Sequence, residues 1–187
     1  MNESIHQDQA QVVESSPALD LSLFDQQKLQ RSLKHAQRSW LFRLITLKVL
    51  PLGSLSGMRV DSADLESCVV GLPGGWRTRN PFGSTYWAAQ GMAAEAASGL
   101  FPFVYCQAAT KRVNMILASC EASFVRQCKG RATFRCEGGA SARAAIALTI
   151  ETGERQLCEH QVVGYDSSGE VVSEWTFVWS LKVSSRG

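Results

Sequence analysis

The residue in this sequence that is best placed to do chemistry is Glu95, a lone carboxylate in a run of small side chains. Between Tyr86 and Leu100 there are six alanines, two glycines and no other charged residue. A carboxylate in apolar surroundings must be solvated, paired with a cation, or poised as a general base or nucleophile. The plainer alternative is a partly exposed helix carboxylate that forms a salt bridge with an arginine.

The residues before Glu95 predict a helix that is entered through a tight turn. The sequence Asn-Pro-Phe-Gly at positions 80–83 is a turn signal, and it could place Asn80 there for turn geometry alone. We expect Ser84 or Thr85 to cap a helix that runs over about residues 84–98, with Gly99 as its stop. Small side chains on this helix would let other segments come close on most sides.

Alternating apolar and polar residues predict an antiparallel sheet around this helix. In the last strand, Trp175, Phe177 and Trp179 share one face. The fold class is therefore α+β, with a curved antiparallel sheet wrapped around a long central helix. The good helix formers of residues 140–152 predict a helical insertion between strands. The strands are predicted over residues 57–66, 67–72, 113–125, 130–137, 156–165 and 170–183.

Before the sheet, the sequence predicts a polar, disordered N-terminal arm over residues 1–20 and a single domain over residues 21–187. The domain opens with an extra amphipathic helix over about residues 25–49, which Asp25 would cap and Pro51 would end. The face of this helix that does not pack on the domain is basic. That face is either simply solvated or contacts an anionic membrane surface through residues 28–48.

Composition narrows the range of functions. The 187 residues carry a net charge of +2, which argues against nucleic acid as a partner. The N-terminus has no basic region followed by an apolar run, so we expect a cytoplasmic protein. The six cysteines lack C-x-x-C spacing and are expected to be free thiols, with no metal site. The sequence shows no phosphate-binding loop and no nucleophile elbow.

The order of these elements, together with Asn80, Gly83 and Glu95, resembles the hotdog fold of the PaaI-like acyl-CoA thioesterases and their DUF4442 relatives. In that family an acid commonly follows the Asn by the fifteen positions that separate Asn80 from Glu95. Residues 122–130 look like the family's F-hydrophobic-R-P-x-x-G corner, with glutamine where proline is usual. Residues 162–172 look like its penultimate hairpin, so the resemblance covers about residues 25–184.

This resemblance implies hydrolysis of an acyl-CoA, or of a related acyl-carrier thioester, by a homodimer or a tetramer. The N–H of Trp87 at the helix start would bind the thioester oxygen. Glu95 of the other protomer would activate water or attack the carbonyl, and the amide of Asn80 would orient the water or the thioester. No cofactor is implied apart from the coenzyme A of the substrate.

The sequence departs from many of these thioesterases where Tyr86-Trp87-Ala88 replaces His-Gly-Gly. This departure motivates an alternative function, a non-catalytic module that binds an acyl or lipid-like ligand. The histidines lie far from the central helix in the sequence, which disfavours the related dehydratases. Ser84 is a further candidate for substrate binding. Four cations could hold the phosphates of coenzyme A or could simply be solvated, namely Lys111, Arg112, Arg126 and Lys129.

Overall fold

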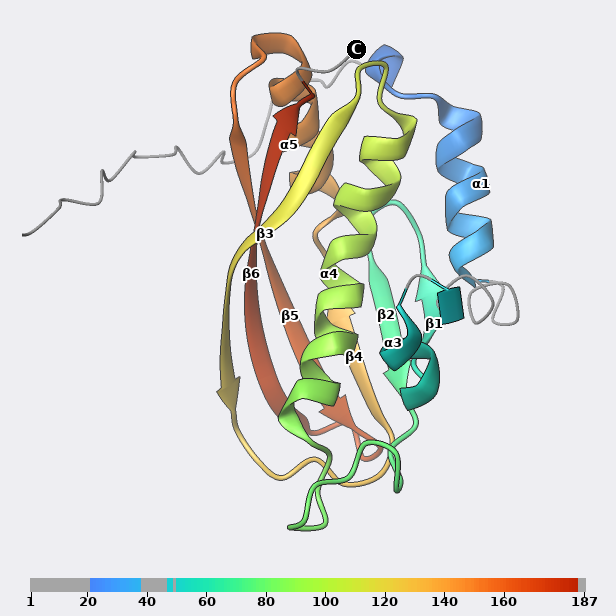
Figure 1. Ribbon diagram of the computed structural model, residues 1–187, viewed down its shortest axis with the longest axis vertical. Coiled ribbons are helices and arrows are strands. Elements are labelled where there is room, and N and C mark those ends of the chain that lie inside the picture. The colour runs from blue at the N-terminus through green and yellow to red at the C-terminus, as the bar shows by residue number, and fades with distance from the viewer. Residues whose placement is uncertain (1–20, 38–46, 49, 185–187) are drawn as a thin grey trace, which may run out of the picture.

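One curved, six-stranded antiparallel sheet wraps around one long helix in the computed structural model (Figure 1). The model describes residues 21–37, 47, 48 and 50–184. The strands follow the order β1-β2-β4-β5-β6-β3 across the sheet, and every neighbouring pair is antiparallel. The predicted fold class is therefore confirmed, while the predicted arm over residues 1–20 lies outside the described residues.

The strands are short on one side of the sheet and long on the other. In β6, the alternation predicted from Trp175, Phe177 and Trp179 is confirmed, because all three side chains are buried. The hairpin expected over residues 162–172 is confirmed as well, since the Asp166 N–H donates to the carbonyl of Glu170. The strand bounds are β1 (Arg59–Ala63), β2 (Cys68–Leu72), β3 (Val113–Phe124), β4 (Ala132–Cys136), β5 (Gln156–Asp166) and β6 (Val171–Val183).

The central helix α4 (Trp87–Ala108) runs along the inner face of the sheet for most of its length (Figure 1). Its predicted end at Gly99 is wrong, because the helix continues for more than two further turns. A side chain at Gly99 would come within 3.0 Å of the indole of Trp179, and one at Gly91 would come within 3.3 Å of Trp175. These glycines therefore let the helix approach the tryptophans of β6, so Gly99 contributes to packing and not to termination.

The N-terminal helix predicted over about residues 25–49 is confirmed where the structure describes it, over residues 26–37 and at residues 47 and 48. Helix α1 (Gln26–Gln37) follows the short 3-10 turn η1 (Leu21–Leu23) and buries Leu29 and Leu33. The carboxylate of Asp25 accepts the Lys28 N–H, which confirms the predicted cap. Most of the remaining predicted helix, residues 38–46 and 49, lies outside the described residues.

Leu50 is not helical, which agrees with a helix stop directly before Pro51, and Pro51 also starts a new helix. The short helix α3 (Pro51–Ser56) carries Pro51 in its first turn, where the missing N–H costs no hydrogen bond. Its end is made by Gly57, whose φ of 80° is left-handed. The first predicted strand therefore begins two residues late, at Arg59.

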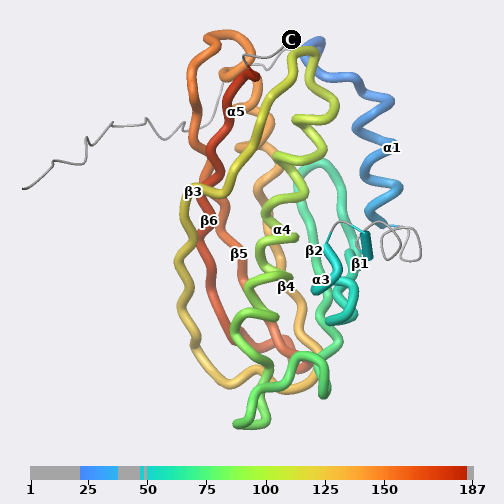
Figure 2. Tube along the Cα trace, in the orientation of Figure 1, coloured from blue at the N-terminus to red at the C-terminus, as the bar shows by residue number. Residues whose placement is uncertain are grey.

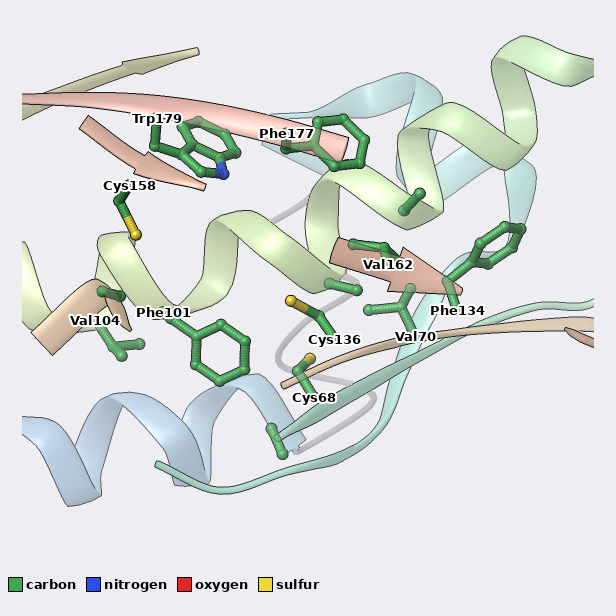
Figure 3. Packing of buried hydrophobic residues seen from close by; sticks show 14 of the residues in the cluster. Cys68, Val70, Phe101, Val104, Phe134, Cys136, Cys158, Val162, Phe177 and Trp179 are labelled. Atoms are coloured by element: carbon green, nitrogen blue, oxygen red, sulfur yellow. The ribbon is translucent and has the colours of Figure 1, made fainter. Parts of the chain in front are cut away.

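The helical insertion predicted over residues 140–152 is confirmed as α5 (Gly139–Thr152), which joins β4 to β5. The core lies between α4 and the sheet. Figure 3 shows Phe101 and Val104 of α4 near Cys68, Cys136 and Cys158 of the strands. All of these side chains are buried. This core fixes α4, and so its first turn, relative to the sheet.

Candidate active site

The loop before α4 is held by its own hydrogen bonds. The side-chain oxygen of Asn80 accepts the N–H groups of Phe82 at 3.0 Å and Ser84 at 3.1 Å, and its amide nitrogen donates to the Ser84 hydroxyl at 3.0 Å. Gly83 completes the turn with a φ of 79°. The turn predicted from Asn-Pro-Phe-Gly is confirmed, and Asn80 and Ser84 are brought together within it.

Two backbone hydrogen bonds fix the position of this loop relative to the rest of the protomer. The N–H of Thr85 donates to the carbonyl of Cys128 at 2.7 Å, and the N–H of Tyr86 donates to the carbonyl of Thr78 at 2.6 Å. On the other side of the loop, an added Cβ at Gly74 would lie 2.1 Å from the carbonyl oxygen of Gly130. The start of α4 is therefore positioned by backbone contacts from two neighbouring loops.

The predicted cap of α4 by Ser84 or Thr85 is wrong. The N-cap is Tyr86, which makes no side-chain cap hydrogen bond. Ser84 is instead engaged with Asn80, as described above. Among the described residues, the backbone N–H groups of Trp87 and Ala88 have no hydrogen-bond acceptor, as is usual in a first helical turn. They lie at the positive end of the helix dipole and can bind an oxyanion.

Glu95 lies two turns further along α4 with its side chain exposed in the single protomer. No cation among the described residues pairs with it, so the predicted alternative of a salt bridge to an arginine is not seen there. Partial desolvation raises the pKa of Glu95 above its usual value. A carboxylate with a raised pKa and no partner is suited to general base chemistry.

The structure separates the four predicted phosphate-binding cations. Lys111 and Arg112 follow the C-terminal end of α4, whereas Trp87 begins its N-terminal end (Figure 2). A helix of 22 residues spans about 33 Å. The ammonium group of Lys111 also donates to the carbonyl of Ile150 at 2.8 Å. Neither residue can therefore reach a ligand at the start of α4 of the same protomer.

The other two predicted cations, Arg126 and Lys129, lie in the corner between β3 and β4, whose Cys128 carbonyl holds the loop before α4. Arg126 forms an exposed ion pair with Glu170 at 3.0 Å. Lys129 is exposed and has no partner among the described residues. Of the four cations, only Lys129 is thus both uncommitted and near the start of α4.

A cleft of about 630 Å³ opens beside the first two turns of α4. Its walls are α3, the loop segment 76–79 and the start of α4. Sequence reasoning did not select this segment, although Trp-Arg-Thr-Arg directly before Asn80 was a readable signal. The residues that line the cleft are Leu52, Leu55, Ser56, Trp76, Arg77, Thr78, Arg79, Tyr86, Ala88, Ala89 and Met92.

His160, which lies far from α4 in the sequence, contacts it in the structure. The Nδ1 atom of His160 is 3.0 Å from the carbonyl oxygen of Ser98, and its Nε2 atom is 3.0 Å from the thiol of Cys158. Burial lowers the pKa of His160 to about 4. His160 is 1% exposed, so it is a neutral core residue and not part of the candidate site.

Part of the inner face of the sheet is uncovered beside the start of α4. In the pairing of β3 with β6, Cys120, Ala122 and Phe124 stand opposite Phe177, Trp175 and Ser173. The three residues of β6 are buried, but their partners on β3 are exposed. Since directly paired residues share a face, an apolar part of the inner face is open at the free edge of β3.

No described helix is long and apolar enough to cross a bilayer.

The chain is similar in sequence to one family and in structure to several known proteins. The model of the family described as "Domain of unknown function (DUF4442)" matches residues 38–181. No curated protein sequence matches significantly. A Pseudomonas aeruginosa protein of unknown function, described as a probable thioesterase, has a TM-score of 0.65 at 21% identity, covering 78% of this chain and 96% of that chain.

Two further solved structures are thioesterases. One from Haemophilus influenzae has a TM-score of 0.59 at 15% identity and covers 77% of this chain and 92% of that chain. One from Staphylococcus aureus has a TM-score of 0.56 at 17% identity and covers 71% of this chain and 98% of that chain. Crystal structures of the Staphylococcus aureus protein include a glutamine-to-alanine variant and a glutamate-to-alanine variant fifteen positions later. At these identities the likeness shows the fold, which is the predicted hotdog fold.

Proposed function

This chain belongs to the DUF4442 family, and from that premise we propose that it hydrolyses an acyl-CoA or a related acyl thioester as a homodimer. One observation carries the proposal: the free N–H groups of Trp87 and Ala88 open beside an apolar cleft, and the same helix carries the unpaired carboxylate of Glu95. The thioesterase descriptions of structures that share the fold support it.

The spacing along α4 argues that two protomers build each site. Trp87 and Glu95 are eight residues apart, which is about 12 Å along a helix axis. A single thioester carbon cannot contact both groups at that separation. The helix start of one protomer and Glu95 of its partner would have to meet at the substrate, as the family resemblance implies.

The exposed inner face of β3 supplies a reason for the dimer. β3 is an edge strand of 12 residues, and an edge of that length is a ready surface for pairing. Phe124 is 50% exposed although it packs edge-on against Trp175. A second copy that pairs along β3 would cover Ala122 and Phe124 and would bring the two α4 helices to one interface.

In the proposed reaction, Glu95 acts as the general base toward a water molecule. The water oxygen attacks the carbonyl carbon of the thioester while its proton passes to the carboxylate. The N–H groups of Trp87 and Ala88 stabilise the oxyanion of the tetrahedral intermediate. The carbon–sulfur bond then breaks and the thiolate takes the proton from Glu95, which leaves a carboxylic acid and a thiol. Trp87 is 55% exposed, and its backbone N–H has no acceptor among the described residues.

Asn80 contributes to the proposed site mainly through the turn. Its side chain fixes the Phe82 and Ser84 N–H groups, and one of its two amide hydrogens remains for a water or a thioester oxygen. The fifteen-residue spacing of Asn80 and Glu95 equals that between the glutamine and the glutamate substituted in the Staphylococcus aureus thioesterase. This correspondence supports the choice of both residues.

The test is thiol release from short, long and aromatic acyl-CoAs, measured for the wild type and for Glu95→Gln. We expect turnover of at least one substrate and a fall in kcat of about 100-fold or more in the variant. Glu151→Gln, an exposed glutamate at the end of α5, is the matched control and should leave turnover unchanged. The chain's own cysteines are alkylated first, so that their thiols do not add to the signal.

Two outcomes would contradict the proposal. Turnover that survives Glu95→Gln unchanged would remove the proposed mechanism. Retention of an intact acyl-CoA by the purified protein, with no turnover of any substrate in the panel, would favour a non-catalytic binding module. In that case the exposed Trp87, in place of the usual glycine, would be the residue to examine.

A further inference from the structure

The cleft beside α4 has an apolar wall that no described residue covers. α3 presents Leu52 and Leu55 to it, and their side chains are 65% and 62% exposed. Met92 and the two alanines Ala88 and Ala89 form the opposite wall on α4. A groove of about 630 Å³ with such walls can hold a flexible chain of mixed methyl and methylene groups.

Two arginines also line this cleft. The guanidinium group of Arg77 stands 5.6 Å from the centre of the Trp76 ring, and Trp76 is 80% exposed. Neither Arg77 nor Arg79 forms an ion pair among the described residues. None of the described residues that line the cleft is acidic. The cleft therefore carries uncompensated positive charge next to an apolar wall, which is complementary to an anionic amphiphile.

A third feature lies between the arginines. Thr78 lines the cleft and is 3% exposed, and its hydroxyl has no hydrogen-bond partner among the described residues. A buried hydroxyl without a partner is destabilising, so such groups usually have a hydrogen-bond partner. A ligand with an amide or carbonyl along an otherwise apolar chain could supply that partner.

We propose that this cleft binds the phosphopantetheine arm of the substrate's carrier, with its phosphate on Arg77 and Arg79. The assignment rests on the proposed function, whose thioester would join this arm at the adjacent start of α4. The arm has apolar methyl and methylene groups for Leu52 and Leu55, and amides for the hydroxyl of Thr78. Arginine suits phosphate because its planar fork donates two parallel hydrogen bonds. Phosphate recognition is thereby assigned to segment 76–79, and not to Lys111 or Arg112 at the far end of α4.

The charge test compares two substrates with the same acyl group, octanoyl-CoA and octanoyl-pantetheine, of which the second lacks phosphates. In the double variant Arg77→Glu and Arg79→Glu, we expect the KM for octanoyl-CoA to rise about tenfold or more, because two attractions become repulsions. The KM for octanoyl-pantetheine and the kcat for both substrates should stay near their wild-type values. Equal KM changes for both substrates, or none for octanoyl-CoA, would overturn the proposal.

Arg155→Glu is the matched control for the charge change. Arg155 is exposed in the turn before β5, at the end of the sheet where β3 begins and β6 ends. It should leave the KM for octanoyl-CoA unchanged. Far-UV circular dichroism and thermal melting of all variants would show that the substitutions leave the fold intact.

Binding of free coenzyme A by calorimetry gives a readout that does not depend on hydrolysis. We expect Leu55→Trp, which fills the cleft from an exposed position, and the double arginine variant to weaken this binding. Arginine-dependent binding without turnover would refute the proposed function and leave this inference standing. Turnover together with coenzyme A binding that does not depend on the arginines would support the proposed function and overturn this inference. If Leu55→Trp only shortens the preferred acyl chain, the cleft holds the acyl group and the proposal is overturned.

Discussion

The Nδ1 atom of His160 lies 3.0 Å from the carbonyl oxygen of Ser98, the very carbonyl that Pro102 leaves without a helical donor. In an unbroken helix, the N–H of residue 102 would donate to Ser98, but proline has no N–H. The imidazole N–H of His160 supplies the missing donor from β5. His160 Nε2 is then free to accept the thiol hydrogen of Cys158. A proline within the central helix is thus matched by a neutral histidine on the sheet.

This pairing predicts a stability loss at mildly acidic pH. The pKa of His160 is about 4 in the folded chain against about 6.5 when unfolded, so protons bind preferentially to the unfolded chain between these values. The free energy of unfolding should fall as the pH drops from about 6.5 to 4, by up to about 3 kcal/mol. Urea denaturation at a series of pH values measures this. In His160→Gln the decline should shrink, while the exposed His35→Gln should retain it; parallel curves for all three proteins would contradict the assignment.

The pH dependence of turnover should report Glu95. A base must be deprotonated to accept a proton, and the pKa of Glu95 is raised by desolvation. We therefore expect kcat/KM to decline as the pH falls through a midpoint above the usual glutamate value of about 4.3. Rate profiles below pH 7, corrected for unfolding, would show it. A midpoint at or below the usual value, or an unchanged acid limb in the residual activity of Glu95→Gln, would argue that another group is the base.

The open inner face of β3 predicts how the dimer can be broken. Ala122→Arg places a charge on the inner face, where we expect it to prevent pairing and yield a monomer without turnover. Ser123→Arg adds the same charge one residue later on the outer face, because strand neighbours point to opposite faces, and should remain dimeric. Light scattering after gel filtration measures the mass of each. A dimeric Ala122→Arg protein would place the interface elsewhere.

Cys120 offers a second measurement of the same interface. Of the six cysteines, all of which lie in described residues, it alone is exposed in the protomer, whereas burial raises the pKa of Cys68, Cys106 and Cys136 to about 12. A maleimide should therefore label one thiol quickly in the monomeric Ala122→Arg variant and more slowly in the wild-type dimer. Equal labelling rates would show that Cys120 stays open in the assembled protein.

Gly74 should be more sensitive to substitution than other glycines with a positive φ. Gly74 and Gly169 have φ values of 73° and 80°, so alanine strains both backbones by about 1 kcal/mol. Only Gly74 also faces another backbone, the Gly130 carbonyl, whereas the space around Gly169 is open. We expect Gly74→Ala to cost about 2–4 kcal/mol in urea unfolding and Gly169→Ala about 1 kcal/mol. Equal losses would mean that the loop before segment 76–79 can shift to make room.

Local patterns in the sequence were sufficient for the order of elements. The alternation in β6, the Asn80 turn and the helix formers of α5 each depend on neighbours along the chain, and each is confirmed. The patterns failed where the role of a residue is determined by a contact that the local sequence pattern does not show. Gly99 reads as a helix stop until Trp179 is known to pack against it, and Ser84 reads as a cap until Asn80 is seen to engage its hydroxyl.

The candidate site was predictable only in part for the same reason. The interval from Asn80 to Glu95 is visible in the sequence, and so is the helix start between them. The separation of Lys111 from Trp87 depends on where α4 ends, which is ten residues beyond the predicted end at residue 98. The cleft could not be foreseen, because it requires α3 to stand beside segment 76–79, and no periodicity encodes that contact.

The four tryptophans that lie in described residues give two separate optical signals. Trp175 and Trp179 are buried behind the glycines of α4, so their emission should be blue-shifted and should move to longer wavelength only when the helix leaves the sheet. Trp76 and Trp87 are exposed at the cleft and at the helix start, where a soluble quencher such as iodide reaches them. Protection of Trp76 and Trp87 from iodide would therefore report occupancy of the site. The emission of Trp175 and Trp179 would report folding in the same sample, without any label.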